Sequence, residues 1–209
     1  AGQHLEIDAA GVRAQVRLPL VGAFQAENAI AAFTLATVLD SGRRGALAAL
    51  AGLTGAPGRL QPAGSSAGAA AFIDYAHTPE ALRAAIAALR PHTAGRIVTV
   101  FGCGGDRDRA KRAVMGRIAA ELSDVAIVTD DNPRSEDAAA IRAEIMAACP
   151  GGIEIGDRRE AIVRAVSMLR QGDAALIAGK GHETGQIVGD QVLPFDDLSV
   201  TGEAMEART

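Results

Sequence analysis

The fold of this sequence is set by the stretch Ile97–Arg112, IVTVFGCGGDRDRAKR. Its first part, Ile97–Phe101, consists of β-branched and aromatic residues, the composition of a buried parallel strand. Glycines at positions 102, 104 and 105 follow, and they let the backbone turn and pass close to a ligand. Charged residues then crowd the start of the next helix. This order is typical of ligand sites in open α/β sheets. The alternative is a tight turn with solvated charges, but such a turn needs one glycine rather than three.

The pattern on either side of this stretch predicts an α/β fold. Val114, Ile118 and Leu122 recur every four residues, which predicts a helix with one apolar stripe facing the sheet. Strands and helices alternate from residue 70 to 178, which predicts right-handed crossovers and a Rossmann-like, mainly parallel sheet with helices on both faces. The expected strands are 70–75, 97–101, 125–129, 153–155 and 174–178, with helices from Pro79 (capped by Thr78), from 138 to 148 and from Asp157, a hairpin around 189–190, and a weakly patterned tail.

Residues 1–56 have a different pattern from residues 57–209. The first 20 residues alternate in apolar character around Gly11, which predicts a two-stranded ribbon. Helical spacing runs from Ala23 to Leu39, where 40–42 stops it, and from Ala46 to Leu53, before a turn-rich segment at 54–58. This block has too few strands for a sheet of its own, so we expect it to be the end of a larger domain.

The composition of the chain limits the kind of protein that it can be. The 209 residues are 48% hydrophobic and carry a net charge of −4, and no basic, aromatic-studded face is evident, which argues against nucleic acid as a partner. We find neither a signal peptide at the N-terminus nor an apolar run long enough to enter a membrane. The two cysteines, Cys103 and Cys149, suggest reduced thiols rather than a disulfide framework or a zinc cage. We therefore expect a cytoplasmic α/β protein.

Polar clusters follow four of the expected strands, each at its carboxyl end. They are Asp74-Tyr75-Ala76-His77, the glycine-rich charged loop, the segment 130–137 (DDNPRSED), and 179–183 (GKGHE). The carboxyl ends of parallel strands meet at one rim of a sheet, so we expect a crevice that carries both signs of charge.

The side chains of this crevice suit a zwitterionic amino acid. Arg107 and Arg134 provide a planar, bidentate grip on a carboxylate. Glu183 is an acceptor for an ammonium group, and the carbonyls of Gly179 and Gly181 serve the same purpose. The alternative for the 130–137 segment is a helix-capping loop, with Ser135 or Asp137 as the cap.

Several roles remain open for three further side chains, those of His77, His182 and Lys180. Either histidine could act in catalysis, ligate a metal or donate to a nucleotide, although a partly buried histidine satisfied by the backbone is the simpler interpretation. Lys180 lies between glycines as in a phosphate-binding loop, but the sequence G-x-x-x-x-G-K-[ST] does not occur. Arg107 occupies the position of the last glycine in a dinucleotide-binding fingerprint, so a Rossmann oxidoreductase is the weakest candidate.

The motifs YAHTPE, FGCGGDRD, TDDNPR and AGKGHE, in this order and at these separations, resemble the C-terminal domain of the Mur ligases. The resemblance runs from about Gly22 to Phe195 and is to members that add meso-diaminopimelate to UDP-N-acetylmuramoyl-L-alanyl-D-glutamate (the UDP-MurNAc-dipeptide) in peptidoglycan synthesis. It implies that the free end of diaminopimelate is bound by Arg107, Asn132, Arg134, Gly179 and Glu183.

The resemblance also implies an ATP site. In GAFQAENAIAA, Asn28 matches the residue that reads adenine, whereas Gln25 departs from the usual asparagine. Arg59 matches an arginine at the ATP phosphates, and Asp74, Tyr75 and His77 match residues that domain closure brings near ATP. By the same resemblance, residues 1–56 are the end of the central ATP-binding domain, and 57–209 form the amino-acid-binding domain.

The family's P-loop, magnesium ligands, modified lysine and UDP-sugar domain have no counterpart in this sequence. We therefore expect a fragment that is inactive alone, tightly binds no cofactor and contains no catalytic or metal-ligating residue. The full-length enzyme would be a monomeric ligase that uses ATP and Mg²⁺. The alternatives are a sister ligase with another amino acid, and a stand-alone binding domain that lost catalysis.

Overall fold

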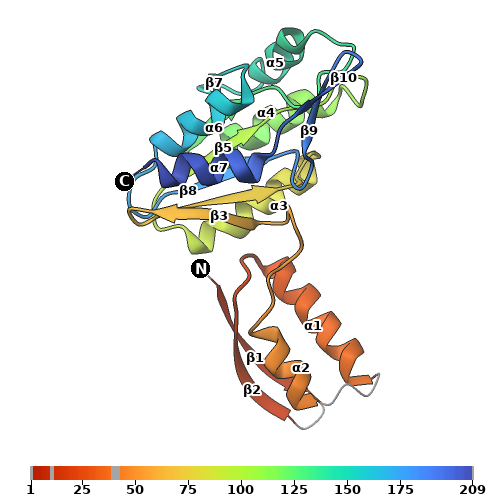
Figure 1. Ribbon diagram of the computed structural model, residues 1–209, viewed down its shortest axis with the longest axis vertical. Helices are drawn as coiled ribbons and strands as arrows, with labels where there is room; N and C mark the ends of the chain where they lie inside the picture. Colours follow the sequence, from red (N-terminus) through yellow and green to blue (C-terminus); the bar gives the residue numbers. More distant parts are fainter. Residues whose placement is uncertain (1, 10–11, 39–42, 209) are drawn as a thin grey trace. The chain divides into compact units, whose positions relative to one another are not determined.

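The computed structural model describes residues 2–9, 12–38 and 43–208, which form two compact units, residues 1–56 and 57–209. The C-terminal unit contains a six-stranded sheet in the order β3-β4-β8-β5-β6-β7 (Figure 1). All neighbouring strands are parallel except β3 and β4, which are antiparallel. The predicted mainly parallel α/β fold is therefore confirmed. The strands are β3 (Gln61–Ser66), β4 (Ala69–Asp74), β5 (Ile97–Phe101), β6 (Val125–Val128), β7 (Ile153–Glu154) and β8 (Ala174–Ala178).

Helices cover both faces of this sheet. On one face, α6 (Arg158–Ser167) and α7 (Asp197–Glu206) lie side by side, and their apolar residues share a core with β4, β5 and β8 (Figure 1). The other three helices pack against one another in chain order: α3 (Pro79–Leu89), α4 (Lys111–Leu122) and α5 (Ala138–Met146). All residues of β5 and β8 are buried, as expected for strands covered on both sides.

The predicted helix starts agree with the capping geometry. The Thr78 hydroxyl accepts a hydrogen bond from the Ala81 backbone N–H, and Asp157 caps α6 through the N–H of Glu160. At the start of α5 the cap is Asp137 rather than Ser135, because the Asp137 carboxylate accepts from Ala139 N–H. The segment 130–137 therefore contains a helix cap as well as pocket-lining residues.

The sequence pattern missed β3, α7 and the short 3₁₀ helix η1 (Arg90–His92), and it misplaced one apolar face. Strand β3 was not predicted because Pro62 and Gly64 are poor strand formers. An edge strand tolerates such residues. Helix α7 has weak apolar periodicity, but the carboxylate of Asp196 caps it. In α4 the buried apolar residues are Met115, Ile118 and Ala119, whereas Val114 is 39% exposed, so the predicted stripe was wrong at that position.

The N-terminal unit contains an antiparallel ribbon and two helices. Strands β1 (Gln3–Ala9) and β2 (Val12–Leu18) pair as predicted, and α1 (Ala23–Val38) follows the expected helical spacing. Helix α2 (Arg43–Leu50) begins and ends about three residues earlier than predicted. Leu39 and the predicted stop at 40–42 lie outside the described residues, as does the turn at Gly11. The small core includes Ile7, Leu18 and Phe33.

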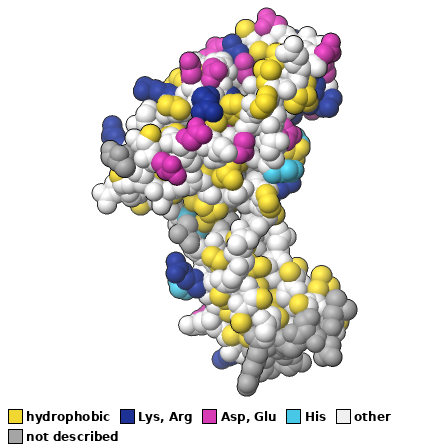
Figure 2. Space-filling view, in the orientation of Figure 1, with side chains coloured by type: hydrophobic (Ala, Val, Ile, Leu, Met, Phe, Trp, Pro, Cys, Tyr) yellow, Lys and Arg dark blue, Asp and Glu magenta, His cyan; other side chains and the backbone are white. Residues whose placement is uncertain are grey.

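The remaining strands, β9 (Gly185–Val188) and β10 (Gln191–Pro194), form the predicted hairpin. On the face of the C-terminal unit shown in Figure 2, acidic and basic side chains are interspersed. Within the described ranges, no helix is both long and apolar enough to cross a membrane.

Candidate functional site

The carboxyl ends of β4, β5, β6 and β8 enclose a cavity of about 340 Å³. Its lining includes all five residues expected to bind the amino acid and two of those expected near ATP. The full lining is Tyr75, His77, Gly102, Gly104, Arg107, Lys111, Asp131, Asn132, Arg134, Gly179 and Glu183. The four polar clusters therefore meet at one rim of the sheet, as the parallel topology requires.

Arg134 is held in an unusual backbone conformation at this cavity. Its φ is +52°, in the left-handed region that costs a non-glycine residue on the order of 1 kcal/mol. The hairpin fixes this backbone on both sides, because Arg134 N–H donates to the Ile187 carbonyl (3.1 Å) and Gly189 N–H donates to the Arg134 carbonyl (2.8 Å). The guanidinium donates to the Gly105 carbonyl at 2.9 Å. Arg134 thus has a fixed position before any ligand binds.

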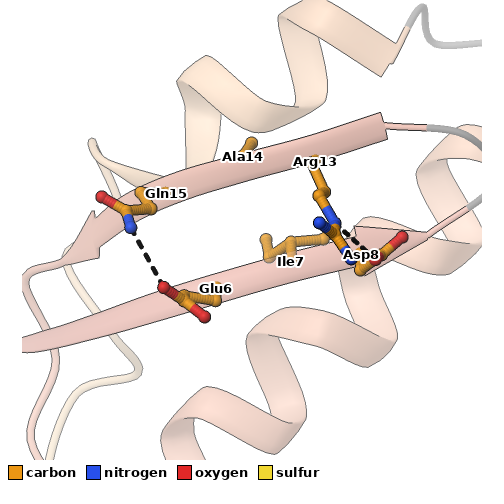
Figure 3. Close-up of a pocket in the computed structure, with 6 residues that line it drawn as sticks. All are labelled: Glu6, Ile7, Asp8, Arg13, Ala14 and Gln15. Carbon is orange, nitrogen blue, oxygen red and sulfur yellow. Dashed lines mark hydrogen bonds and ion pairs between the residues drawn. The ribbon is translucent and has the colours of Figure 1, made fainter.

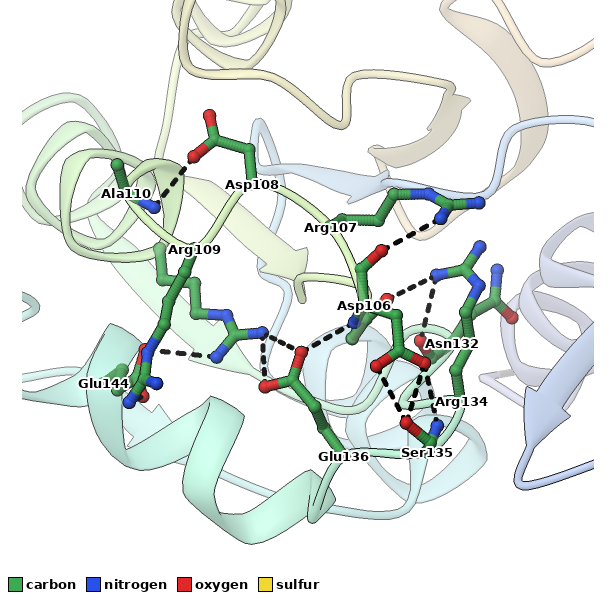
Figure 4. Close-up of polar contacts among 12 residues, drawn as sticks. Asp106, Arg107, Asp108, Arg109, Ala110, Asn132, Arg134, Ser135, Glu136 and Glu144 are labelled. Carbon is green, nitrogen blue, oxygen red and sulfur yellow. Dashed lines mark hydrogen bonds and ion pairs between the residues drawn. The ribbon is translucent and has the colours of Figure 1, made fainter.

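The loops that carry Arg107 and Arg134 are in direct contact. A Cβ atom on Gly105 would lie 1.9 Å from the Pro133 carbonyl oxygen, so only glycine allows this approach. The Asp106 carboxylate accepts from the backbone N–H and the hydroxyl of Ser135, and these hydrogen bonds lower the pKa of Asp106. Figure 4 shows the guanidinium groups of Arg107 and Arg134 on the same side of these loops.

A buried arginine, Arg112, also holds together the loops that carry Arg107 and Arg134. The Arg112 side chain is 1% exposed and donates to both carboxylate oxygens of Glu136 at 2.8 Å. Glu136 also accepts from the Asp106 N–H at 2.6 Å. The hydrogen bonds from Arg112, followed by that from Asp106, lower the pKa of Glu136. Arg112 reaches Glu144 as well, at 3.1 Å, which ties α4 to α5.

The acidic part of the cavity is built around Glu183. Its Oε2 accepts from Asn132 Nδ2 at 3.1 Å and from Lys180 Nζ at 3.3 Å. Arginines and a glutamate therefore line one cavity, and this arrangement can hold a molecule that carries both a carboxylate and an ammonium group.

The residues expected near ATP are found in both units. Tyr75 contacts the rings of His77 and His182, with centroid distances of 4.5 and 5.5 Å, and the Arg59 guanidinium lies over its ring at 5.2 Å. His77 Nδ1 lies 2.8 Å from the Tyr75 carbonyl oxygen. Asn28 belongs to α1 of the N-terminal unit, where its side chain is exposed.

Asp74 differs from the other residues expected near ATP because its carboxylate is buried. It accepts from the backbone N–H groups of Leu60 and Ala76, each at 2.8 Å. Burial raises the pKa of Asp74, although the two hydrogen bonds and the nearby Arg59 oppose this rise. In this geometry Asp74 holds the segment that presents Tyr75 and His77.

The structure gives little support for a cysteine nucleophile or for a metal site. Burial raises the pKa of the Cys103 thiol to about 12, which leaves it unreactive as a nucleophile. Among the residues that the structure describes, no three His, Cys, Asp or Glu side chains come together as metal ligands.

A larger hollow, of about 420 Å³, lies over the β1–β2 ribbon. It contains two cross-strand pairs, Gln15 with Glu6 at 3.0 Å and Arg13 with Asp8 at 2.8 Å (Figure 3). These polar groups satisfy one another and the ion pair is exposed to water, so the hollow offers less for a ligand than the cavity at the sheet rim.

The sequence model of one family, described as "Mur ligase, glutamate ligase domain", matches residues 58–181. The chain belongs to the Mur ligase family. Relatives within this family are similar over nearly the whole chain. It is 55% identical over 207 residues to the UDP-N-acetylmuramoyl-L-alanyl-D-glutamate–2,6-diaminopimelate ligase of Caulobacter vibrioides, covering 99% of this chain and 43% of that protein. The similarly named ligase of Zymomonas mobilis subsp. mobilis is 51% identical, with 98% and 43% covered.

A solved structure of a ligase with the same name gives a TM-score of 0.75 at 36% identity, covering 98% of this chain and 42% of the other. A more distant Mur ligase, the UDP-N-acetylmuramate–alanine ligase of Thermotoga maritima, shares the fold with a TM-score of 0.65 at 18% identity, covering 100% of this chain and 41% of the other. The chain thus spans less than half the length of these relatives.

Sequence reasoning assigned no role at the cavity to several residues that build it or lie beside it. Lys111 and Asp131 line the cavity, and Lys180 and Arg158 are buried beside it. A charged residue with a fully buried side chain needs a partner on another element. Only the fold reveals that Arg158 pairs with Asp197, 39 residues further along the chain.

Proposed function

We propose that the protein containing this chain is an ATP-dependent ligase that joins meso-diaminopimelate to UDP-N-acetylmuramoyl-L-alanyl-D-glutamate in peptidoglycan synthesis. In this proposal the C-terminal unit binds the amino acid. The observation that supports it best is that Arg107, Arg134 and Glu183, from three separate loops, line one cavity. The printed names of the relatives point to the same amino acid.

The chemistry of diaminopimelate matches the charges of the cavity. Its free end carries a carboxylate and an ammonium group, whereas the free end of lysine has only an ammonium group. In our proposal Arg107 and Arg134 bind the carboxylate. Glu183 and the carbonyl of Gly179 accept from the ammonium group, and Asn132 holds the Glu183 carboxylate in place. The guanidinium of Arg134 is already fixed by the Gly105 carbonyl, so little conformational freedom would be lost on binding.

ATP would bind mainly through residues outside this chain. We assign Arg59, Tyr75 and His77 to the nucleotide side of the cavity, with Asp74 holding their segment, and we assign adenine recognition to Asn28. With Mg²⁺, ATP would transfer its γ-phosphoryl group to the substrate carboxylate and leave as ADP. The amine of diaminopimelate would then attack the acyl phosphate, forming the amide bond and releasing inorganic phosphate. The P-loop and magnesium ligands that the phosphoryl transfer needs are not found in this sequence, so we propose that the chain alone does not turn over.

Titration calorimetry with the 209-residue chain tests the amino-acid site. We expect meso-diaminopimelate to bind and lysine to bind far more weakly. Arg134→Ala should weaken diaminopimelate binding roughly 10- to 150-fold, because a charged hydrogen bond contributes about 1.5–3 kcal/mol. Arg117→Ala is the matched control, since Arg117 is exposed on α4 and does not line the cavity.

The full-length protein provides the second measurement. Phosphate release from ATP, in the presence of the UDP-MurNAc-dipeptide, should depend on diaminopimelate. At diaminopimelate concentrations below KM, it should fall in Arg134→Ala by a factor similar to the loss of binding. Equal phosphate release with lysine would contradict the assigned amino acid. Phosphate release that needs no amino acid would contradict the ligase reaction itself.

A further inference from the structure

Lys180 is buried beneath the cavity. The glycines on either side of it are packed closely: a Cβ on Gly179 would lie 2.6 Å from an Asp131 carboxylate oxygen, and one on Gly181 would lie 2.7 Å from the Tyr75 Cβ. The main chain therefore passes between the loops after β4 and β6, and the Lys180 side chain is 0% exposed. Such burial prevents Lys180 from touching a ligand in the cavity directly.

The Lys180 ammonium contacts Glu183, which would accept from a ligand amine, and Asn132, which holds Glu183. Its Nζ lies 3.0 Å from Asn132 Oδ1 and 3.3 Å from Glu183 Oε2. The backbone N–H of Ile187 also donates to Asn132 Oδ1, at 2.9 Å. Two donors thus face the same atom of the Asn132 amide, so that atom must be the oxygen. The Asn132 NH₂ group is consequently turned toward Glu183, 3.1 Å away.

This arrangement leaves one oxygen of Glu183 for a ligand. Oε2 receives both Asn132 Nδ2 and Lys180 Nζ, and within the described part of the chain Oε1 accepts no hydrogen bond. The Glu183 side chain is 35% exposed and lines the cavity, so Oε1 is the acceptor that an incoming ammonium group would meet.

We propose that Lys180 is a positioning residue that fixes the Asn132 amide and the Glu183 carboxylate for recognition of the second ammonium group of a diamino diacid. The inference rests on the proposed function and adds a specificity determinant to it. A buried ammonium needs acceptors. Asn132 and Glu183 supply them, so the same contacts that stabilise the lysine orient the recognition groups.

The experiment compares two substrates of the full-length protein. The first is meso-diaminopimelate, and the second is L-2-aminopimelate, which retains the reacting amine and the far carboxylate but lacks the far amine. In Lys180→Met, which preserves side-chain length without the charge, we expect the KM for diaminopimelate to rise about tenfold or more, as for loss of a charged hydrogen bond. The KM for the analogue (or its inhibition constant, if it is not turned over) should change less than about threefold, since a ligand without the far amine makes no such bond.

Lys111→Met is the matched control. It removes the only other lysine of the chain, which also lines the cavity, but the Lys111 ammonium donates to the His77 carbonyl and not to Asn132 or Glu183. This variant should leave the preference for diaminopimelate over L-2-aminopimelate unchanged. Glu183→Gln should lose the preference, and adding Lys180→Met to it should lower the preference no further.

Equal weakening of both substrates in Lys180→Met would overturn the proposal, because a merely structural lysine has that effect. If Lys180→Met does not fold, Asn132→Asp replaces it: Lys180 keeps an acceptor, but Glu183 then faces an oxygen instead of the NH₂ group. An unchanged substrate preference in Asn132→Asp would also overturn the proposal. Failure of the wild-type protein to use diaminopimelate would contradict the proposed function instead, so the two failures are distinguishable.

Discussion

Two buried arginines support different loops around the cavity, and their partners differ. Arg112 is 1% exposed and pairs with Glu136, whose side chain is 33% exposed. Arg158 is 0% exposed and pairs with Asp197, which is also 0% exposed. Each arginine makes two hydrogen bonds to the carboxylate of its partner, so the number of hydrogen bonds does not distinguish the pairs. Water can reach the partly exposed Glu136 and replace its hydrogen bonds to Arg112, but it cannot reach Asp197. We therefore expect the two ion pairs to differ greatly in their contribution to the free energy of unfolding.

The two pairs also connect different elements. Arg112 joins α4 to the loop that carries Arg134. Arg158 donates to the Ala178 carbonyl at the end of β8 (3.0 Å) and to the Asp130 carbonyl after β6 (3.3 Å). Arg158 thus ties together the two strand ends that carry Asn132 and Glu183. The contact of α4 with the Arg134 loop depends on an ion pair that reaches water, and the contact between the ends of β6 and β8 depends on an arginine whose ion pair lies inside the protein.

The largest effect is expected for Asp197→Ala. The substitution leaves the Arg158 charge buried without its partner, and breaking such a pair costs about 3–5 kcal/mol. Urea unfolding of the chain measures this loss. The double variant Arg158→Met/Asp197→Leu should lose much less, because it removes both charges and keeps an apolar volume. If Asp197→Ala lowers the free energy of unfolding as little as Glu136→Gln does, burial of the partner does not distinguish the two ion pairs.

A somewhat smaller effect is expected for Gly105→Ala. The added methyl group would lie 1.9 Å from the Pro133 carbonyl and force apart the loops of Arg107 and Arg134. Overpacking of this kind costs about 1–3 kcal/mol. Gly45→Ala in α2 is the control, because no heavy atom lies within 4 Å of the new Cβ there. Thermal unfolding of both variants is the measurement, and equal melting temperatures would show that the loops do not need their close contact.

The smallest effect is expected for Glu136→Gln, and it should depend on pH. The folded-state pKa of Glu136 is lowered, so its contribution to stability is complete above the unfolded value of about 4.3 and is lost as the pH falls through the folded value. Glu136→Gln should therefore flatten the decline of the unfolding free energy below about pH 4.3. Urea unfolding at several pH values checks this. An equally steep decline in the variant would assign the acid sensitivity to other carboxylates.

Local patterns explain which parts of the fold were predictable. β5, β6 and β8 are short apolar strands bounded by glycine and polar residues, and the caps Thr78 and Asp157 precede their helices directly. The edge strand β3 and helix α7 lack such signals. Each is packed against a partner distant in sequence: β3 against α7, and α7 against Arg158.

For the candidate site, too, some features could be predicted from the sequence and others could not. The sequence nominated Arg107, Arg134 and Glu183, because each follows a strand and carries chemistry suited to an amino acid, and the family resemblance added Asn132; all four line the cavity. The orientation of these side chains could not be predicted from the sequence. Whether an arginine after a strand faces the cavity depends on contacts such as those of Arg134 with the hairpin residues Ile187 and Gly189.

The amino-acid sequence alone specifies the alternation of strands and helices and puts four polar clusters at the carboxyl ends of strands, because periodicity, glycine and capping residues act over a few neighbouring positions. The partners of the buried charges, in contrast, are set by the three-dimensional fold. Arg158 with Asp197, Arg112 with Glu136, and Lys180 with Asn132 are separated by 39, 24 and 48 residues. The free energy of burying a charge depends on the partner that the fold brings to it, and no local pattern encodes that partner.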